Sequence, residues 1–269
     1  MITERYGIKM PPEKKIMFQA RLQRRLRELK LTSFETYAEK LFENNGNSDE
    51  FRILADFIST NKTDFFREQN HFDFLTNHVL IEFFQHARLH LNPFLNFWSA
   101  GCSSGQEAYS IAITLEEFRK KSNLNLDYSI TATDISARML KKAKEAIYAM
   151  DQVSDISLEI KHKYFLKSKS ATDSTVRVVK EIRDRVSFSY LNLMNQSYPY
   201  VNKFDVVFLR NTLIYFDSKT QRFVLTRVLE SLKPGGYLII GHSESLINMD
   251  LPIKSVAPSV YVKITADFN

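Results

Sequence analysis

The chain has 269 residues, 44% of them hydrophobic and 25% charged, values typical of a globular protein, which excludes disordered, collagen-like and coiled-coil classes. Lysine and arginine outnumber aspartate and glutamate by 37 to 31, a moderate excess that does not by itself indicate a nucleic-acid partner. A single cysteine closes no internal disulfide and no apolar run approaches the roughly 20 residues that span a bilayer, so we expect a cytoplasmic protein without membrane insertion.

The first part of the chain has the pattern of helices only. Apolar residues recur at helical spacing in its first segment: Phe18, Leu22, Leu26 and Leu29. This stripe predicts a helix across residues 13–30. Thr32 and Glu35 have the spacing of a capping box and predict that a second helix begins there, and a third is expected near residues 49–58. Because no strand pattern follows until well beyond these helices, residues 1–75 are predicted to form a separate all-helical domain.

The remaining residues, 76–269, alternate short apolar runs with helix-length amphipathic segments. Five runs are predicted to be buried strands: 95–100, 128–133, 186–191, 204–209 and 237–240. Three segments between them are predicted to be helices: 106–120, 137–149 and 220–232. This alternation predicts an α/β domain with a parallel sheet covered by helices on both faces. Residues 160–185 interrupt the pattern with two strand-like pieces, which predict a small antiparallel β insertion.

A ligand site is predicted where the first two strands of the sheet end. Gly101 and Gly105 enclose a turn before a helix, where the backbone can approach a ligand closely and free N–H groups are available. Their spacing is G-x-x-x-G and not the G-x-G-x-x-G of dinucleotide-binding proteins. Asp134 ends the second strand, where nucleotide-binding folds place a ribose-binding carboxylate, although it could equally cap the next helix. Together the two features suggest an adenosine-containing cofactor.

Other kinds of catalytic site are not indicated by the sequence. His86 and His90 are four residues apart but lack the glutamate of H-E-x-x-H, and one cysteine makes no thiolate cluster, so we expect no metal. The nucleophile elbow, the P-loop lysine and the kinase motifs are all missing. His242 and Cys102 are therefore assigned structural roles.

Five segments resemble, in order and spacing, those of the CheR family of chemotaxis receptor methyltransferases: STNKTDFFREQNHFDFL, WSAGCSSGQEAYSIA, ITATDISARMLKKAKEAIY, FDVVFLRNTLIYFD and LKPGGYLIIGHSESL. The resemblance extends from about Tyr6 to Val262. It implies a Rossmann-like S-adenosylmethionine-dependent methyltransferase domain behind the helical domain. The implied activity is methyl transfer to glutamate side chains of chemoreceptors in signal transduction, which leaves S-adenosylhomocysteine as the product.

The resemblance also implies which residues form the site. With Gly101 of the turn, the expected cofactor-binding residues are Asn61, Thr63, Arg67, Glu107, Asp134, Asn192, Leu193, Arg210 and Asn211. Arg67 and Tyr215 are implied as catalytic: the arginine would hold the cofactor or the incoming carboxylate, and the tyrosine would approach the methyl donor. The glycine turn departs from the family's commoner GCSTGEEPYS at Ser104, Gln106 and Ala108 but retains the glutamate that follows it.

The implied chemistry explains why no catalytic base was found. A free glutamate has a pKa near ~4.3, so the acceptor is already ionised at neutral pH and needs no general base. The enzyme must align the reactants and control the charge that disappears as anion meets sulfonium. Two other interpretations remain: a non-catalytic S-adenosylmethionine-binding regulatory scaffold, disfavoured by the retained arginines and Tyr215, and a nicotinamide-dependent oxidoreductase, which lacks the glycine spacing.

Two surfaces are candidates for partner binding. Lys14, Arg21, Arg24 and Arg25 are predicted to share a second face of the first helix, within an arc of about 100° and clear of the apolar stripe. That face is either merely solvated or, as the resemblance implies, meets the acidic helices of the receptor. The insertion at 160–185 is similar to the family's small β-subdomain, which in some members binds a receptor's C-terminal peptide by strand addition.

Overall fold

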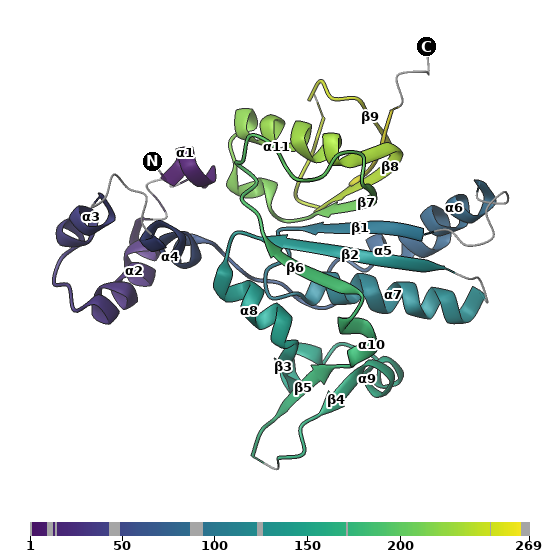
Figure 1. Ribbon diagram of the computed structural model, residues 1–269, viewed down its shortest axis with the longest axis horizontal. Helices are drawn as coiled ribbons and strands as arrows, with labels where there is room; N and C mark the ends of the chain where they lie inside the picture. The colour runs from purple at the N-terminus through teal and green to yellow at the C-terminus, as the bar shows by residue number, and fades with distance from the viewer. Residues whose placement is uncertain are drawn as a thin grey trace.

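The computed structural model describes residues 2–9, 13, 15–42, 49–86, 94–122, 126–170, 172–247 and 249–264. A seven-stranded sheet forms its centre, with a helical lobe on one side and a small second sheet projecting below it in the view of Figure 1. Among the described helices, none has both the length and the apolar character needed to cross a bilayer.

The strand order of the central sheet confirms the predicted parallel arrangement. Across the sheet the strands are β6 (Val186–Tyr190), β2 (Asp127–Asp134), β1 (Phe94–Ala100), β7 (Phe204–Leu209), β8 (Leu232–Ile240), β10 (Val260–Lys263) and β9 (Ile253–Ala257). The first five strands are parallel, whereas β10 runs antiparallel to β8 and β9 antiparallel to β10. This C-terminal hairpin was not predicted from the sequence.

Alternate side chains of the central strands pack against helices on opposite faces of the sheet. Phe97 and Phe208 belong to a core that includes residues of α7 (Gln106–Ser122) and of the helical run α5 (Asn70–Phe74), η3 (Leu75–Val79) and α6 (Leu80–His86). Trp98 and Val207 point to the other face and pack with α11 (Ser218–Ser231). A strand buried on both faces reads as a continuous apolar run, which is why these strands were visible in the sequence.

The N-terminal helices have a hydrophobic core of their own. They are α1 (Ile2–Tyr6), α2 (Lys15–Leu29), α3 (Phe34–Phe42) and α4 (Asp49–Ile58). Phe18 and Leu26 of the predicted stripe are buried in this core. The predicted cap of the second helix is wrong by one residue, because the Ser33 hydroxyl, and not that of Thr32, accepts the N–H of Thr36 at 3.2 Å.

The small sheet has three strands, one more than predicted. Their order is β3 (Ile147–Ala149), β5 (Thr175–Val178) and β4 (Phe165–Lys167), all antiparallel. The helix predicted over residues 137–149 is too long: α8 (Ala137–Glu145) ends where Ala146 adopts a left-handed φ of 55°, and the chain enters β3. The remaining elements are η5 (Met150–Val153), α9 (Leu158–Tyr164), α10 (Lys180–Arg183) and η6 (Leu213–Tyr215).

Candidate functional site

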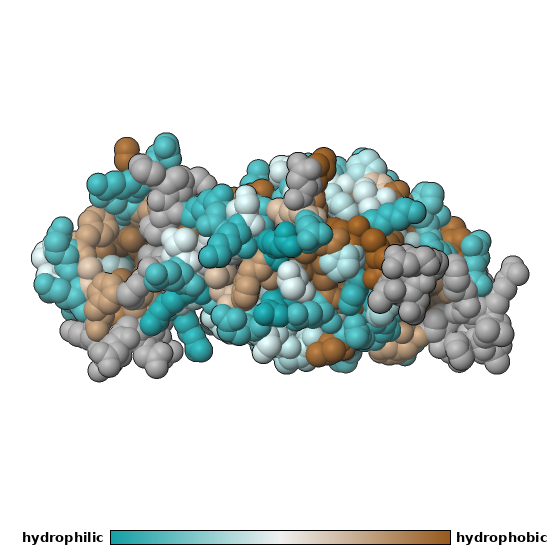
Figure 2. All heavy atoms as spheres, turned by 90° about the horizontal axis from the view of Figure 1, so that it is seen from above, coloured by the Kyte–Doolittle hydropathy of each residue, from teal (hydrophilic) through white to brown (hydrophobic). Residues whose placement is uncertain are grey.

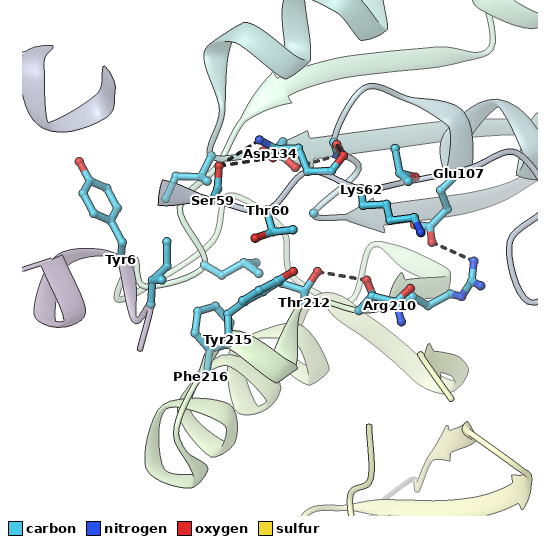
Figure 3. A pocket seen from close by; sticks show the side chains of 18 of the residues that line it. Tyr6, Ser59, Thr60, Lys62, Glu107, Asp134, Arg210, Thr212, Tyr215 and Phe216 are labelled. Carbon is cyan, nitrogen blue, oxygen red and sulfur yellow. Dashed lines mark hydrogen bonds and ion pairs between the residues drawn. The ribbon is translucent and has the colours of Figure 1, made fainter. Parts of the chain in front are cut away.

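One pocket lies at the carboxyl ends of β1, β2 and β7, the edge where parallel α/β sheets bind ligands. It encloses about 1000 Å³, including its solvent-open mouth. All eleven predicted site residues line it: Asn61, Thr63, Arg67, Gly101, Glu107, Asp134, Asn192, Leu193, Arg210, Asn211 and Tyr215. In Figure 3, Asp134 lies on one side and Tyr215 on the other, with Arg210 and Glu107 at one end and Tyr6 at the opposite end.

The glycine turn after β1 is held close to two other walls of the pocket. Gly101 has a φ of 82°, and a Cβ there would lie 2.5 Å from the Thr212 hydroxyl, so only glycine fits. The Ser103 hydroxyl donates to the carbonyl of Asn61 at 3.0 Å, which ties the turn to the segment after α4. The turn therefore joins the ends of β1 and β7 to the helical lobe.

Asp134 presents a buried carboxylate to the pocket. One oxygen accepts the N–H of Ser103 at 2.7 Å and the other accepts the N–H of Ser136 at 2.8 Å, and the residue is 8% exposed. Burial raises the pKa of this carboxyl, although the two N–H groups act in the opposite direction. The Ser136 hydroxyl, and not Asp134, caps α8 by accepting the N–H of Met139 at 3.1 Å. The alternative role of Asp134 as a helix cap is thus wrong.

At the other end of the pocket, the Arg210 guanidinium bridges two carboxylates. It donates to Glu107 at 3.1 Å and to Glu68 at 3.0 Å, and it also donates to the carbonyl of Arg67. Burial raises the pKa of Glu107; for Glu68, burial acts upward as well, but the guanidinium outweighs it and lowers the pKa. Asn211 donates its amide to the same Glu68 at 3.2 Å. Two carboxylates therefore share one guanidinium here, in a pocket that Lys62 and Arg67 also line.

The sequence did not reveal that Glu68 also meets two histidines. Ligand atoms of Glu68, His71 and His242 lie within 4.8 Å of one another, and these residue types can bind metals. His71 is 2% exposed, and neither ring nitrogen has a hydrogen-bond partner. Burial, with the nearby Arg210, lowers the pKa of His71 to about 4, so the ring is neutral at pH 7. Because Arg210 already pairs with Glu68, a second cation is disfavoured and we assign this group no metal.

The two residues expected to be catalytic come from different parts of the pocket. Tyr215 ends η6, and its carbonyl accepts the N–H of Lys9 at 2.9 Å. Arg67 lies on the segment after α4 and donates from Nη1 to the carbonyl of Lys62 at 3.3 Å. Asn192 donates its amide to the carbonyl of Arg5 at 2.7 Å. The start of the chain is therefore fastened to the pocket at two points.

Further pocket residues were missed by the sequence analysis. They are Tyr6, Ile8, Ser59, Thr60, Lys62, Asp64, Ser103, Ile135, Leu191, Thr212 and Phe216. Most are chain neighbours of predicted residues and could have been found by extending each motif by one position. Tyr6 and Ile8 had no such signal, because only the tertiary fold brings α1 to the pocket.

A second, basic groove lies next to the pocket and shares part of its wall. The shared residues are Ser59, Asn61, Lys62, Thr63 and Asp64. Five cationic side chains line the groove, together with the carboxylates of Asp56 and Asp64: Arg21, Arg24, Lys62, Arg138 and Lys142. Figure 2 shows the molecule from above, on the side of α11, where hydrophilic side chains are interspersed with smaller hydrophobic areas. The groove thus runs between α2 and α8, beside the pocket.

The predicted basic face of α2 is only partly available to a partner. Arg25 forms a two-pronged ion pair with Glu50 at 2.8 and 2.6 Å and its side chain is 16% exposed, so its placement on a free face is wrong. Arg21 donates to the carbonyls of Ile58 and Ser59, both at 3.1 Å. Arg24 has a side chain that is 72% exposed, paired with a glutamate of the same helix. Lys14 lies outside the described residues.

Comparison with known proteins identifies relatives along nearly the whole chain. The family models "CheR methyltransferase, all-alpha domain" and "CheR methyltransferase, SAM binding domain" match residues 1–59 and 61–262. The chemotaxis protein methyltransferase of Borreliella burgdorferi is 36% identical over 263 residues, which cover 98% of this chain and 91% of the relative. Those of Salmonella typhimurium and Escherichia coli are 37% and 35% identical, covering 93% and 97% of this chain and 82% and 87% of the relatives.

Solved structures give a weaker likeness. A DszA carbon methyltransferase aligns with a TM-score of 0.39 at 17% identity, covering 84% of this chain and 46% of that one. The family models and the relatives, and not this alignment, identify the chain.

Proposed function

This chain belongs to the CheR family of chemotaxis protein methyltransferases, and we propose that its pocket is where S-adenosylmethionine and a receptor glutamate meet. Members of this family transfer methyl groups from S-adenosylmethionine to glutamate side chains of chemoreceptors, and that is the activity of this chain. The observation that supports the pocket as the site is that all the predicted residues, from widely separated segments, line one cavity.

Two groups of pocket residues fit different parts of the cofactor. Asp134 uses one lone pair of each oxygen on a backbone N–H, so the remaining lone pairs can accept ribose hydroxyls. The two carboxylates that share Arg210 suit a ligand with an ammonium group, because their oxygens can accept its N–H groups. Asn192 and Leu193 also line the pocket, and the adenine is expected beside them.

Bound S-adenosylmethionine supplies an electrophilic methyl group. The chain's own contribution is to align the acceptor carboxylate and to exclude competing water, because a carboxylate needs no base. We assign Arg67 to holding the incoming carboxylate by paired N–H bonds and the Tyr215 hydroxyl to orienting it. His71 is not assigned as a base, because its buried ring does not line the pocket and its pKa of about 4 makes it a weak proton acceptor.

We assign the receptor's acidic helices to the basic groove. Its cations outnumber its carboxylates, and Lys62 lines both the groove and the pocket, so a helix in the groove would bring its glutamates to the pocket mouth. The proposed contact surface includes Arg24 on α2 and also Arg138 and Lys142 on α8, in place of the face predicted on α2 alone. The groove therefore extends the predicted contact surface from the helical lobe to α8.

A second receptor contact is assigned to the small sheet. Its edge strand β4 is unpaired on one side within the described sheet, and Leu166, which lies opposite Arg177 on β5, is 58% exposed. A receptor's C-terminal peptide could add there as a further strand. Because the receptor helices concerned lie inside the cell, we place the reaction in the cytoplasm.

Transfer of tritium from labelled S-adenosylmethionine to a receptor fragment tests the activity. The label should be released by mild base, as expected of a glutamyl methyl ester. Base-stable label, or cofactor binding without transfer to any receptor fragment, would contradict the reaction and favour a non-catalytic scaffold.

Charge reversal tests the groove. Arg138→Glu combined with Lys142→Glu should raise KM for the receptor fragment by about ten-fold at low salt and by less at high salt, because attraction between exposed charges is screened over about 8 to 10 Å at physiological ionic strength. The matched control is Lys254→Glu, an exposed lysine on the edge strand β9. An unchanged KM in the double variant at low salt would remove the groove from the receptor contact.

A further inference from the structure

Glu244 has a buried carboxylate that is surrounded by backbone donors. It follows β8 in the segment GHSE, and the residue is 8% exposed. Its Oε2 accepts the N–H groups of Gly241 and Asn211 at 2.7 and 2.9 Å. Its Oε1 accepts those of Leu213 and Ile214 at 2.7 and 3.3 Å. Four N–H groups from two separate segments therefore converge on one side chain.

These bonds join the end of β8 to the turn that follows β7. Asn211 in that turn has a φ of 55°, an unusual conformation for a residue other than glycine, and its N–H points at the carboxylate. Gly241 allows the close approach of the two segments, because a Cβ there would lie 2.4 Å from the Asn211 amide and 3.0 Å from Oε2. The carboxylate thus occupies the space between two chain segments that could not otherwise satisfy their N–H groups.

The turn held by Glu244 carries residues of the pocket. Asn211 and Thr212 line it, and Tyr215 completes the 3-10 turn that begins at Leu213 (Figure 3). Glu244 itself does not line the pocket. Any influence it has on methyl transfer must therefore pass through the turn.

We propose that Glu244 is a positioning residue for methyl transfer, which fixes the turn of residues 211–215 so that Tyr215 faces the reacting groups. The proposal rests on the proposed role of Tyr215. A carboxylate suits this task because its two oxygens offer about four lone pairs for four N–H donors. An amide in its place has one accepting oxygen, and its NH₂ group would face N–H groups with no bond to make.

The test compares Glu244→Gln with a matched substitution at the opposite end of the same strands. Asp205, at the start of β7, is also buried and accepts the N–H of Asn96 at 2.8 Å and the ammonium of Lys233 at 2.8 and 2.9 Å. Asp205→Asn therefore also weakens a buried carboxylate network, but far from the pocket. For each protein, kcat and KM with a receptor fragment, Kd for S-adenosylhomocysteine and thermal unfolding are measured.

In Glu244→Gln, kcat should fall by about ten-fold or more while KM for receptor and Kd for S-adenosylhomocysteine change by less than about three-fold. The cofactor product should be retained because Asp134 and Asn192 are held by bonds that Glu244 does not make. Glu244→Asp, which keeps the carboxylate on a shorter stem, should recover part of kcat. Asp205→Asn should keep kcat within about two-fold of the wild type even where it unfolds earlier.

Wild-type kcat in Glu244→Gln would overturn the proposal, as would an equal loss of kcat in Asp205→Asn. If Glu244→Gln fails to fold, Glu244→Asp decides: wild-type kcat in that variant overturns the proposal, and a lowered kcat with intact S-adenosylhomocysteine binding supports it. A wild-type protein that transfers no methyl group would instead contradict the proposed function.

Discussion

Replacing Asp134 with asparagine should weaken the binding of S-adenosylhomocysteine without unfolding the chain. Each oxygen of the carboxylate already accepts one backbone N–H, at 2.7 and 2.8 Å, and has a lone pair left for a ribose hydroxyl. The amide keeps one accepting oxygen, so one ribose contact and one backbone contact are lost. A hydrogen bond to a charged group contributes about 1.5 to 3 kcal/mol, which corresponds to a loss of about 10- to 150-fold in affinity.

Isothermal titration calorimetry at pH 7.5 measures this loss directly, since the product binds without turnover. Asp205→Asn is the control, because it makes the same chemical change to a buried carboxylate at the other end of the sheet. Circular dichroism establishes that both variants are folded. The control should bind S-adenosylhomocysteine as the wild type does.

The dependence on pH gives an independent check of the same contact. Burial raises the pKa of Asp134, and the protonated carboxyl, like the amide, has lost its charge. Affinity in the wild type should therefore fall as the pH is lowered through this raised pKa, and the Asp134→Asn variant should lack that dependence. If folded Asp134→Asn binds within about two-fold of the wild type, Asp134 does not contact the ribose and the proposed orientation of the cofactor is wrong.

Three further results are expected. Arg210→Met should lower the free energy of unfolding by about 3 to 5 kcal/mol at pH 7, because it leaves two buried carboxylates without their cation. These carboxyls would then have a folded pKa above the unfolded value, so the loss, measured by denaturant unfolding, should shrink as the pH falls. An unchanged stability at pH 7 contradicts this. Tyr215→Phe should lower kcat while leaving the free energy of unfolding nearly unchanged. The rate of methyl transfer by the wild type should show no dependence on pH that comes from a histidine of the enzyme. An inflection near pH 6.5 that disappears in His242→Gln would instead indicate a catalytic base. Arg25→Met should lower the free energy of unfolding by about 1 to 3 kcal/mol yet leave KM for receptor unchanged. A raised KM would show instead that Arg25 contacts the receptor.

The sheet was predictable where its strands are buried on both faces. The runs at 95–100 and 204–209 are predominantly apolar, and the structure places them side by side at the centre. The hairpin of β9 and β10 at the sheet edge was missed because its residues are mostly exposed or half-buried and mixed in character. Strand β3 was included in the predicted helix, because alanine is a good helix former and the sequence does not indicate the left-handed conformation of Ala146.

Only those residues of the candidate site that belong to recognisable sequence motifs could be predicted. Asp134 and the glycine turn follow from the rule that parallel sheets bind ligands at their carboxyl ends. Helical periodicity was used to place the basic residues of α2 clear of the apolar stripe, but at about 100° per residue Arg25 lies within about 20° of Phe18 and so beside that stripe. It could not show that Arg25 meets Glu50 or that Arg21 meets the carbonyl of Ile58, because these partners are distant in sequence. Periodicity gives the direction of a side chain and not what lies there.

The segment after α4 links the two surfaces that the reaction needs. Residues 59–64 form one wall of the pocket and one wall of the basic groove. The segment is fixed on one side by Arg21, which binds the carbonyl of Ser59, and on the other by Ser103, which binds the carbonyl of Asn61. A receptor helix in the groove would press on the same backbone that encloses the cofactor. The helical lobe therefore belongs to the proposed active site, because its Tyr6 and Ile8 line the pocket and its Arg21 and Arg24 line the groove.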